Sequence, residues 1–158
     1  MDLTVKRFEL EDVPAVLGLL REFAEYEDLV QYLDVTAERI ETAFFADGAT
    51  VEGLVAVTDG STVGYAFFFP NFASFRGQRG FYLEDIYVTE SCRGKGIGEA
   101  MLRELSRLAK ERGYERIDFV VLDWNTTAID FYKRHGAEMD HSERHFKFTD
   151  DAFRSLAK

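Results

Sequence analysis

The 158-residue sequence has one cysteine and no long apolar run. Because Cys92 has no second cysteine to pair with, the chain cannot form an internal disulfide, and nothing favours an oxidising compartment. The N-terminal residues lack the basic and then apolar pattern of a signal peptide, and no apolar stretch approaches membrane-spanning length. We therefore expect a cytoplasmic protein without a membrane partner.

Positive charge is also scarce. The chain has 19 Lys and Arg against 29 Asp and Glu, a net charge of −10, and a pI near 4.8. Such a balance disfavours nucleic acid as a partner and favours a small cationic molecule. The three histidines show no spacing typical of a metal site, so no metal is expected.

The chain is long enough to bury one core, and it contains no repeat, linker or low-complexity tract. We therefore expect a single domain over residues 1–158. Its 15 Phe and 7 Tyr predict an aromatic-rich interior. Apolar periodicity predicts the order βααβββαβαββ, an α/β (mixed α+β) fold with a mixed, mostly antiparallel sheet flanked by helices. The expected strands are 3–8, 50–58, 62–69, 81–88, 117–122, 137–139 and 145–148.

Local signals set several boundaries. Asp59-Gly60-Ser61 between two β-rich runs predicts a hairpin. Asp12, Thr36 and Asn125 are the expected caps of three helices, and a last turn of helix is expected over 150–156. The polar segment Phe72 to Arg79 is expected to be a mobile loop.

A glycine-rich turn, 93–98, stands between an expected strand and an expected helix that runs to residue 112. Glycines at the start of a helix leave N–H groups and the positive end of the helix dipole facing outward, which suits a phosphate. A Rossmann fingerprint beginning at Gly94 needs a third glycine where Glu99 stands, and no Gly-Lys-Ser/Thr triplet of a P-loop is present. What fits is Arg93-x-x-Gly96-x-Gly98.

Glu84 and Asp85 interrupt the otherwise apolar strand 81–88. Strand alternation sends the two carboxylates to opposite faces, so at least one is expected to meet a core-like environment. A buried carboxylate is costly unless it is hydrogen-bonded, neutralised or functional. A structural role for each acid and a functional one both remain open on these grounds.

Four motifs carry a resemblance to a known family. They are Tyr82-Leu83-Glu84-Asp85, Arg93-Gly94-Lys95-Gly96-Ile97-Gly98, Trp124-Asn125 and Phe131-Tyr132-Lys133-Arg134. Together they resemble the diamine (spermidine/spermine) N-acetyltransferase branch of the GCN5-related N-acetyltransferase (GNAT) superfamily, and the likeness covers most of the chain. It implies acetyl-CoA as co-substrate, a small cationic amine as acceptor and a homodimer.

The resemblance also implies residue roles. Backbone groups of Ile86, Tyr87 and Val88 would hold the pantetheine arm and the acetyl carbonyl. The pyrophosphate would be enclosed by Arg93, Gly94, Lys95, Gly96, Ile97, Gly98 and Glu99, with further cofactor contacts from Asn125 and Ala128. Tyr132 matches the general acid that protonates the CoA thiolate, although its spacing alone is typical of a core residue.

On the amine side, the resemblance implies that the substrate is received by Tyr26, Glu27, Glu84, Asp85, Asp123 and Trp124. Arg144 stands where the family has an acid that would hold a distal ammonium, which favours a shorter diamine or a lysine-like amine whose carboxylate Arg144 pairs with. Glu84 is the candidate path for the proton that the ammonium must lose before direct attack in a ternary complex. Acetylation of protein lysines and a non-catalytic acyl-CoA sensor are the alternatives.

Overall fold

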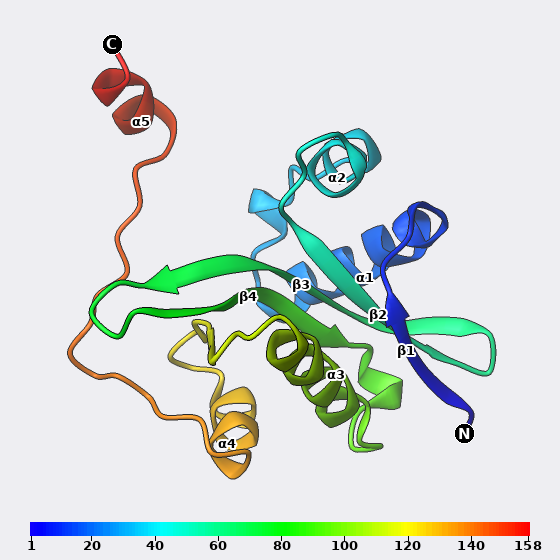
Figure 1. Cartoon of the computed structure of the whole chain (residues 1–158). Helices are drawn as coiled ribbons and strands as arrows, with labels where there is room; N and C mark the ends of the chain where they lie inside the picture. The colour runs from blue at the N-terminus through cyan, green and yellow to red at the C-terminus, as the bar shows by residue number, and fades with distance from the viewer. The chain divides into compact units, whose positions relative to one another are not determined.

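A computed structural model describes all of residues 1–158 and divides the chain into two compact units, Met1–Val120 and Val121–Lys158. The first is a five-stranded sheet in the order β1-β2-β3-β4-β5, antiparallel except for the β4–β5 pair (Figure 1). Its strands are β1 Leu3–Arg7, β2 Glu52–Thr58, β3 Ser61–Ala73, β4 Gln78–Val88 and β5 Arg116–Asp118, and its helices are α1 Val13–Tyr26, α2 Ala37–Phe45 and α3 Ile97–Glu111.

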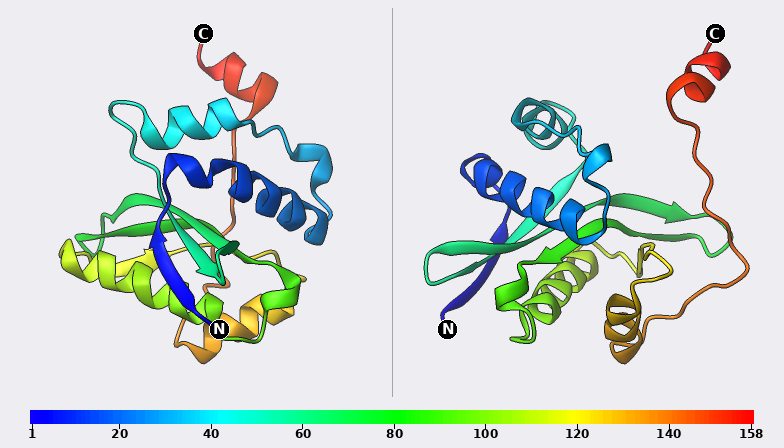
Figure 2. Two further views of the ribbon diagram at one scale, coloured as in Figure 1. Left: turned by 90° about the vertical axis from the view of Figure 1, so that its right-hand side faces the viewer. Right: turned by 180° about the vertical axis from the view of Figure 1, so that it is seen from behind.

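Helices cover both faces of this sheet: α1 and α2 lie on one and α3 on the other (Figure 2). Each face has its own core. Against α1 and α2 the core is aromatic, with Phe44 and Phe67 ring centroids 4.4 Å apart and Tyr65 and Phe67 centroids 4.8 Å apart. Against α3 it contains Phe68, Phe81 and mainly aliphatic side chains. The aromatic interior expected from composition is confirmed.

The hairpin predicted at Asp59-Gly60 joins β2 to β3, and both turn residues have positive φ, 49° and 77°. By contrast, the expectation of a mobile loop over 72–79 is wrong. Residues 72 and 73 continue β3, residues 78 and 79 begin β4, and only 74–77 form the turn. Cross-strand pairing therefore continues past Pro70 and Asn71, which the sequence had suggested as the end of the strand.

Three expected strands are also corrected. Strand 117–122 is reduced to β5, which pairs with β4 only from Gly80 to Tyr82. The expected strands 137–139 and 145–148 are absent, so the observed order is βααβββαβαα. The second unit instead contains α4 Thr126–Arg134 and α5 Asp150–Leu156, joined by chain without helix or strand. Apolar runs of this length do not become strands without a hydrogen-bonding neighbour.

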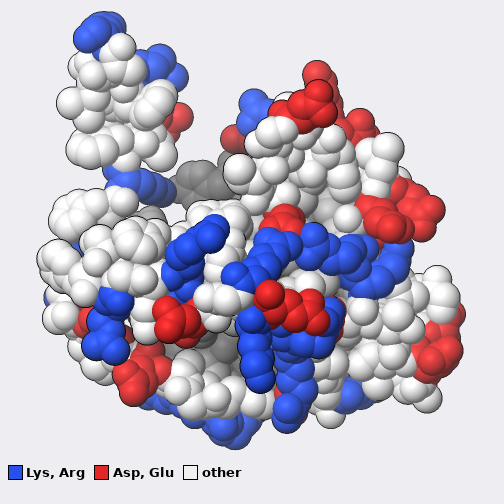
Figure 3. All heavy atoms as spheres, in the orientation of Figure 1, with Lys and Arg blue, Asp and Glu red and all other residues white.

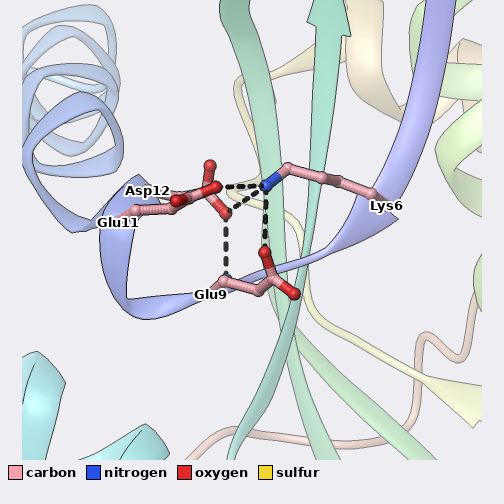
Figure 4. Close-up of polar contacts among 4 residues, drawn as sticks. All are labelled: Lys6, Glu9, Glu11 and Asp12. Carbon is pink, nitrogen blue, oxygen red and sulfur yellow. Dashed lines mark hydrogen bonds and ion pairs between the residues drawn. The ribbon is translucent and has the colours of Figure 1, made fainter.

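A charged cluster fixes the start of α1. The Asp12 carboxylate accepts a hydrogen bond from the Glu9 N–H at 2.9 Å, and the Lys6 ammonium lies 3.1 Å from the same oxygen, with Glu9 and Glu11 at 3.4 and 3.5 Å (Figure 4). Asp12 therefore closes the 3₁₀ turn 10–12. The prediction that its side chain caps α1 is wrong. Thr36 and Asn125 do cap their helices.

Candidate functional site

A β-bulge in β4 determines where the two central carboxylates lie. Phe67 of β3 pairs with Asp85 and Phe68 pairs with Leu83, so Glu84 is the extra residue. Leu83 and Ile86, three residues apart, both pack against the α3 core. Alternation counted from each of them sends Glu84 and Asp85 to the α1 face. The expectation of opposite faces is therefore wrong, because it assumed an unbroken strand.

The two acids have different surroundings. Glu84 is exposed, whereas Asp85 is half-buried and its Oδ2 accepts a hydrogen bond of 3.4 Å from the hydroxyl of the fully buried Tyr65. Burial raises the pKa of Asp85 to about 7, with further increases from the charges of Glu84 and Glu27 and an opposing decrease from the Tyr65 hydrogen bond. None of the ion pairs within this unit includes Glu27, Glu84 or Asp85.

The C-terminal end of α1 adds the other expected amine-binding residues. Glu27 follows the last helical residue, and burial raises the pKa of its carboxyl group. Tyr26 is partly exposed, and the guanidinium carbon of Arg93 lies 4.5 Å from its ring centroid and 5.2 Å from that of Tyr87. Arg93 also donates from Nε to the Val88 carbonyl at 3.0 Å. One guanidinium therefore joins α1, the end of β4 and the glycine-rich turn.

The glycine-rich turn has the backbone that the sequence predicts. Gly94 and Gly96 have φ of 71° and 79°, and a Cβ at either position would meet nothing within 4 Å. The first intrahelical bond of α3 runs from the Ala100 N–H to the Gly96 carbonyl at 2.9 Å. The N–H groups of the three preceding residues, 97–99, are thus without an acceptor inside the helix. This arrangement fits a phosphate, through backbone amides and the helix dipole.

The side chains of this turn point elsewhere. The Lys95 ammonium donates to the Ser91 carbonyl at 3.0 Å, and the Glu99 carboxylate accepts from Arg103 at 2.6 Å. Ile97 is buried in the core under α3. The anion-binding capacity of the turn therefore comes from its main chain. Figure 3 shows Lys and Arg side chains gathered over the face that α3 covers, a local basic area on a protein of net negative charge.

The segment of β4 before the turn has an open edge. β3 pairs with Ile86, Tyr87 and Val88 on one side, but β5 ends at Asp118, opposite Tyr82. Backbone groups beyond that point on the β5 side have no strand partner within this unit. A bulge bends the strand that carries it, which accounts for the separation of β4 from β5 just before Glu84.

The remaining expected residues belong to the second unit. Asn125 Oδ1 accepts from the Ala128 N–H at 3.2 Å and caps α4, on which Tyr132 lies. Asp123 and the half-exposed Trp124 precede that cap. The Arg144 guanidinium donates to the carbonyls of residues 141 and 143 at 3.3 and 3.2 Å, so it braces its own turn.

Two residues near the carboxylates were missed from the sequence. Tyr65 is one aromatic among several in β3, and only the strand register places its hydroxyl against Asp85. Glu22 lies in the last part of α1, and its carboxylate accepts from the Thr89 hydroxyl at 2.7 Å and from the Tyr87 hydroxyl at 3.4 Å. No sequence signal distinguishes these two residues, because each contact joins elements far apart in the chain.

None of the helices combines the length and the apolar character that a membrane span requires. Residues 14–137 match the model of the acetyltransferase (GNAT) family. Thialysine N-epsilon-acetyltransferase of Bos taurus is 34% identical over a stretch that covers 92% of each chain. L-ornithine N5-acetyltransferase NATA1 of Arabidopsis thaliana is 37% identical over 102 residues, 65% of this chain and 45% of the plant protein.

Two further comparisons agree with these. Spermidine/spermine N(1)-acetyltransferase-like protein 1 of Homo sapiens is 31% identical over 140 residues, 84% of this chain but only 20% of the human protein. The solved structure of integron cassette protein VCH_CASS6, from the mobile metagenome of V. cholerae, superposes with a TM-score of 0.83 at 24% identity, covering 100% of this chain and 99% of the other. The last similarity bears on the fold.

Proposed function

The chain belongs to the acetyltransferase (GNAT) family, and on this premise we propose that it transfers an acetyl group from acetyl-CoA to a primary amine of a small cationic molecule. The observation that carries the proposal is an anion-binding turn that follows a strand with two carboxylates, neither of which has a Lys or Arg partner within the unit. Gly94 and Gly96, both with positive φ, and the first N–H groups of α3, which have no acceptor inside the helix, suit a diphosphate. Glu84 and Asp85 lie on β4, which leads into that turn.

Acetyl-CoA supplies the thioester that the amine attacks. In this proposal main-chain groups of residues 93–99 bind its pyrophosphate, and the open edge of Ile86, Tyr87 and Val88 binds the pantetheine arm and polarises the acetyl carbonyl. Asn125 and Ala128, whose hydrogen bond begins α4, add cofactor contacts. Tyr132 protonates the departing thiolate. Attack is direct and passes through a ternary complex.

Acidic groups receive the amine. Glu27, Glu84 and Asp85 have no Lys or Arg partner within their unit, so an ammonium ion would supply the missing positive charge. We assign further amine contacts to Tyr26, Asp123 and Trp124. The named activities of the relatives, on thialysine, ornithine and polyamines, all concern amines on a short aliphatic chain.

Arg144 bears on the choice among these amines. Its guanidinium is bound only by backbone carbonyls within its own turn, so it retains its capacity for a carboxylate. A lysine-like amine carries a carboxylate, whereas putrescine and spermidine do not. We therefore propose a thialysine- or ornithine-like acceptor ahead of a long polyamine. We also infer a homodimer, as the resemblance implies, and a cytoplasmic location.

A panel of amines tests the function. Purified protein and acetyl-CoA are mixed with putrescine, spermidine, spermine, lysine, thialysine or ornithine, and CoA release and the acetylated product are measured. We expect turnover that is fastest with thialysine or ornithine, and Arg144→Ala should raise KM for these two while sparing putrescine. CoA binding without turnover of any amine would instead indicate a sensor, and turnover only of a lysine-containing peptide would indicate a protein acetyltransferase.

A further inference from the structure

Of the two carboxylates at the bulge, that of Asp85 is the one that is partly buried. It lies opposite Phe67, on the face covered by α1, and its carboxylate accepts a hydrogen bond from the hydroxyl of the fully buried Tyr65. Glu84, one residue earlier, is the unpaired extra residue of the bulge and is exposed. The bulge thus gives two adjacent acids unequal solvation.

The charged and titratable groups around Asp85 come from three elements. Tyr65 faces it from β3, Glu84 lies beside it on β4, and Glu27 faces it from the end of α1. Tyr87 lies further along β4, where its hydroxyl and ring engage Glu22 and Arg93. Arg93 is therefore occupied by two tyrosine rings and the Val88 carbonyl, and Asp85 has no basic side chain as a partner in its unit.

We propose that Asp85, and not Glu84, takes the proton from the substrate ammonium, and that Tyr65 positions its carboxylate for this step. This proposal rests on the proposed acetyl transfer. The N–H bond of the ammonium breaks, a new O–H bond forms on Asp85, and the electron pair stays on nitrogen. That pair then forms a C–N bond at the thioester carbon, the C–S bond breaks, and the sulfur leaves with a proton from Tyr132. The second proton that the nitrogen loses as it becomes an amide restores the Tyr132 hydroxyl. Asp85 returns its proton to water before the next turnover.

The protonation behaviour of Asp85 suits this role. An effective general base has a pKa near the pH at which it works, so that it is available as a base and still holds a proton well. With its pKa at about 7, Asp85 meets both conditions at neutral pH. Glu84 and Glu27 raise that value by their negative charge and Tyr65 lowers it by its hydrogen bond, so each neighbour changes it in a known direction.

The test compares the pH dependence of kcat/KM in five proteins, with the best amine of the panel as substrate. Wild type should rise to a plateau with an apparent pKa near 7. Asp85→Asn should lose about 10²-fold or more in kcat and show no inflection near pH 7. Tyr65→Phe should move the inflection to higher pH, and Glu84→Gln should move it to lower pH. A shift of half a unit changes kcat/KM on the acidic limb by about threefold.

Tyr82→Phe is the matched control, since Tyr82 is also a strand tyrosine, in β4, and the acids whose charges add to burial in raising the pKa of its hydroxyl are Glu84 and Asp118, not Asp85. It should leave the inflection unmoved. An inflection that disappears in Glu84→Gln but persists in Asp85→Asn overturns the assignment while the proposed function stands, and so does a Tyr65→Phe profile identical to wild type. If none of the amines in the panel causes the wild-type protein to release CoA, the proposed function is overturned, and the role of Asp85 with it.

Discussion

At the scale of single residues, Tyr132 is the residue whose role depends most on the family. It lies in α4, beyond a cap formed by Asn125, on a helix whose apolar side equally suits a structural tyrosine. The two roles differ in what the hydroxyl does. A structural hydroxyl stabilises the fold, whereas a general acid protonates the leaving group.

Tyr132→Phe separates them. We expect kcat to fall by roughly 10²-fold or more, since the thiolate loses its proton donor, with little change in acetyl-CoA affinity. The rate of CoA release gives kcat, and a binding isotherm gives the affinity for acetyl-CoA. Tyr32→Phe, at a position 72% exposed in the N-terminal unit, is the control and should behave as wild type. Unchanged turnover in the Tyr132 variant would remove this residue from the chemistry.

Asp85 also lowers the stability of the fold at neutral pH, and the pH dependence of this effect has a definite sign. Unfolding returns the pKa of Asp85 from about 7 to 3.8, so between these values the native chain holds a proton that the unfolded chain has lost. The contribution of Asp85 to stability therefore falls as pH rises from about 4 to about 7 and is constant above. A charged group that serves catalysis often lowers the stability of the fold relative to a neutral side chain at the same position.

Asp85→Asn should accordingly stabilise the protein at pH 8, by up to about 4 kcal/mol, and give no gain at pH 4. Urea unfolding at the two pH values measures the difference. Glu84→Gln, at an exposed position, should change stability less. If Asp85→Asn leaves the stability at pH 8 equal to that of wild type, then Asp85 is not destabilised by burial.

At the scale of elements, the turn into α3 is the part that needs glycine for a physical reason. A side chain at Gly96 has room, but its φ of 79° is strained for any residue with a Cβ. We expect Gly96→Ala to cost about 1–2 kcal/mol of stability and to weaken acetyl-CoA binding several-fold, because relaxing the strain would turn the amides away.

Calorimetric titration with acetyl-CoA and thermal unfolding measure these two effects. Gly18→Ala is the control, since Gly18 lies inside α1 without positive φ and an added Cβ meets nothing within 4 Å. That change should be neutral or stabilising by about 0.5–1 kcal/mol and leave binding unchanged. Equal acetyl-CoA affinity in the Gly96 variant and wild type would argue against main-chain capture of the phosphates.

The charged cluster before α1 gives a second prediction at this scale. Asp12 is 7% exposed, accepts the Glu9 N–H and faces Lys6, so Asp12→Ala leaves a donor and a cation without their partner. We expect a loss of about 1–2 kcal/mol. Glu11→Ala, whose carboxylate is 77% exposed and 3.5 Å from the same ammonium, should cost less than about 0.5 kcal/mol. Chemical denaturation compares them, and equal losses would contradict the assigned geometry.

Only part of the fold could be predicted from the sequence. Most short-range signals were reliable: the Asp59-Gly60 turn and the caps at Thr36 and Asn125 each depend on residues within four positions, whereas the cap predicted at Asp12 was wrong. The bulge at Glu84 was not predictable, because it is a mismatch between two strands. The apolar run after β5 resembled a strand, yet pairing with β4 stops before the bulge.

The candidate site divides in the same way. The glycine-rich turn was predictable because its function depends on backbone angles that glycine alone adopts easily. The different surroundings of Glu84 and Asp85 were not predictable, since they depend on which of the two the bulge leaves in water and on a hydroxyl from another strand. Sequence located the carboxylates, and the fold distinguished them.

At the scale of the whole molecule, charge is the dominant property. A net charge of −10 attracts a cationic amine over distances beyond direct contact, and salt screens this attraction. We therefore expect KM for a dicationic amine to rise several-fold between about 0.05 and 0.5 M NaCl, with kcat nearly constant. Steady-state kinetics at the two ionic strengths measure the effect. A zwitterionic acceptor should respond less, and an insensitive diamine KM would show that only local contacts matter.

The central claim is that main-chain amides of residues 93–99 bind the diphosphate of acetyl-CoA and so place its thioester along β4, beside Glu84 and Asp85. A crystal structure of the protein with CoA measures this most directly. We predict the diphosphate oxygens within hydrogen-bond distance of those amides and the thiol beside residues 86–88. CoA bound at another place, with the glycine turn in contact with none of it, would contradict the account.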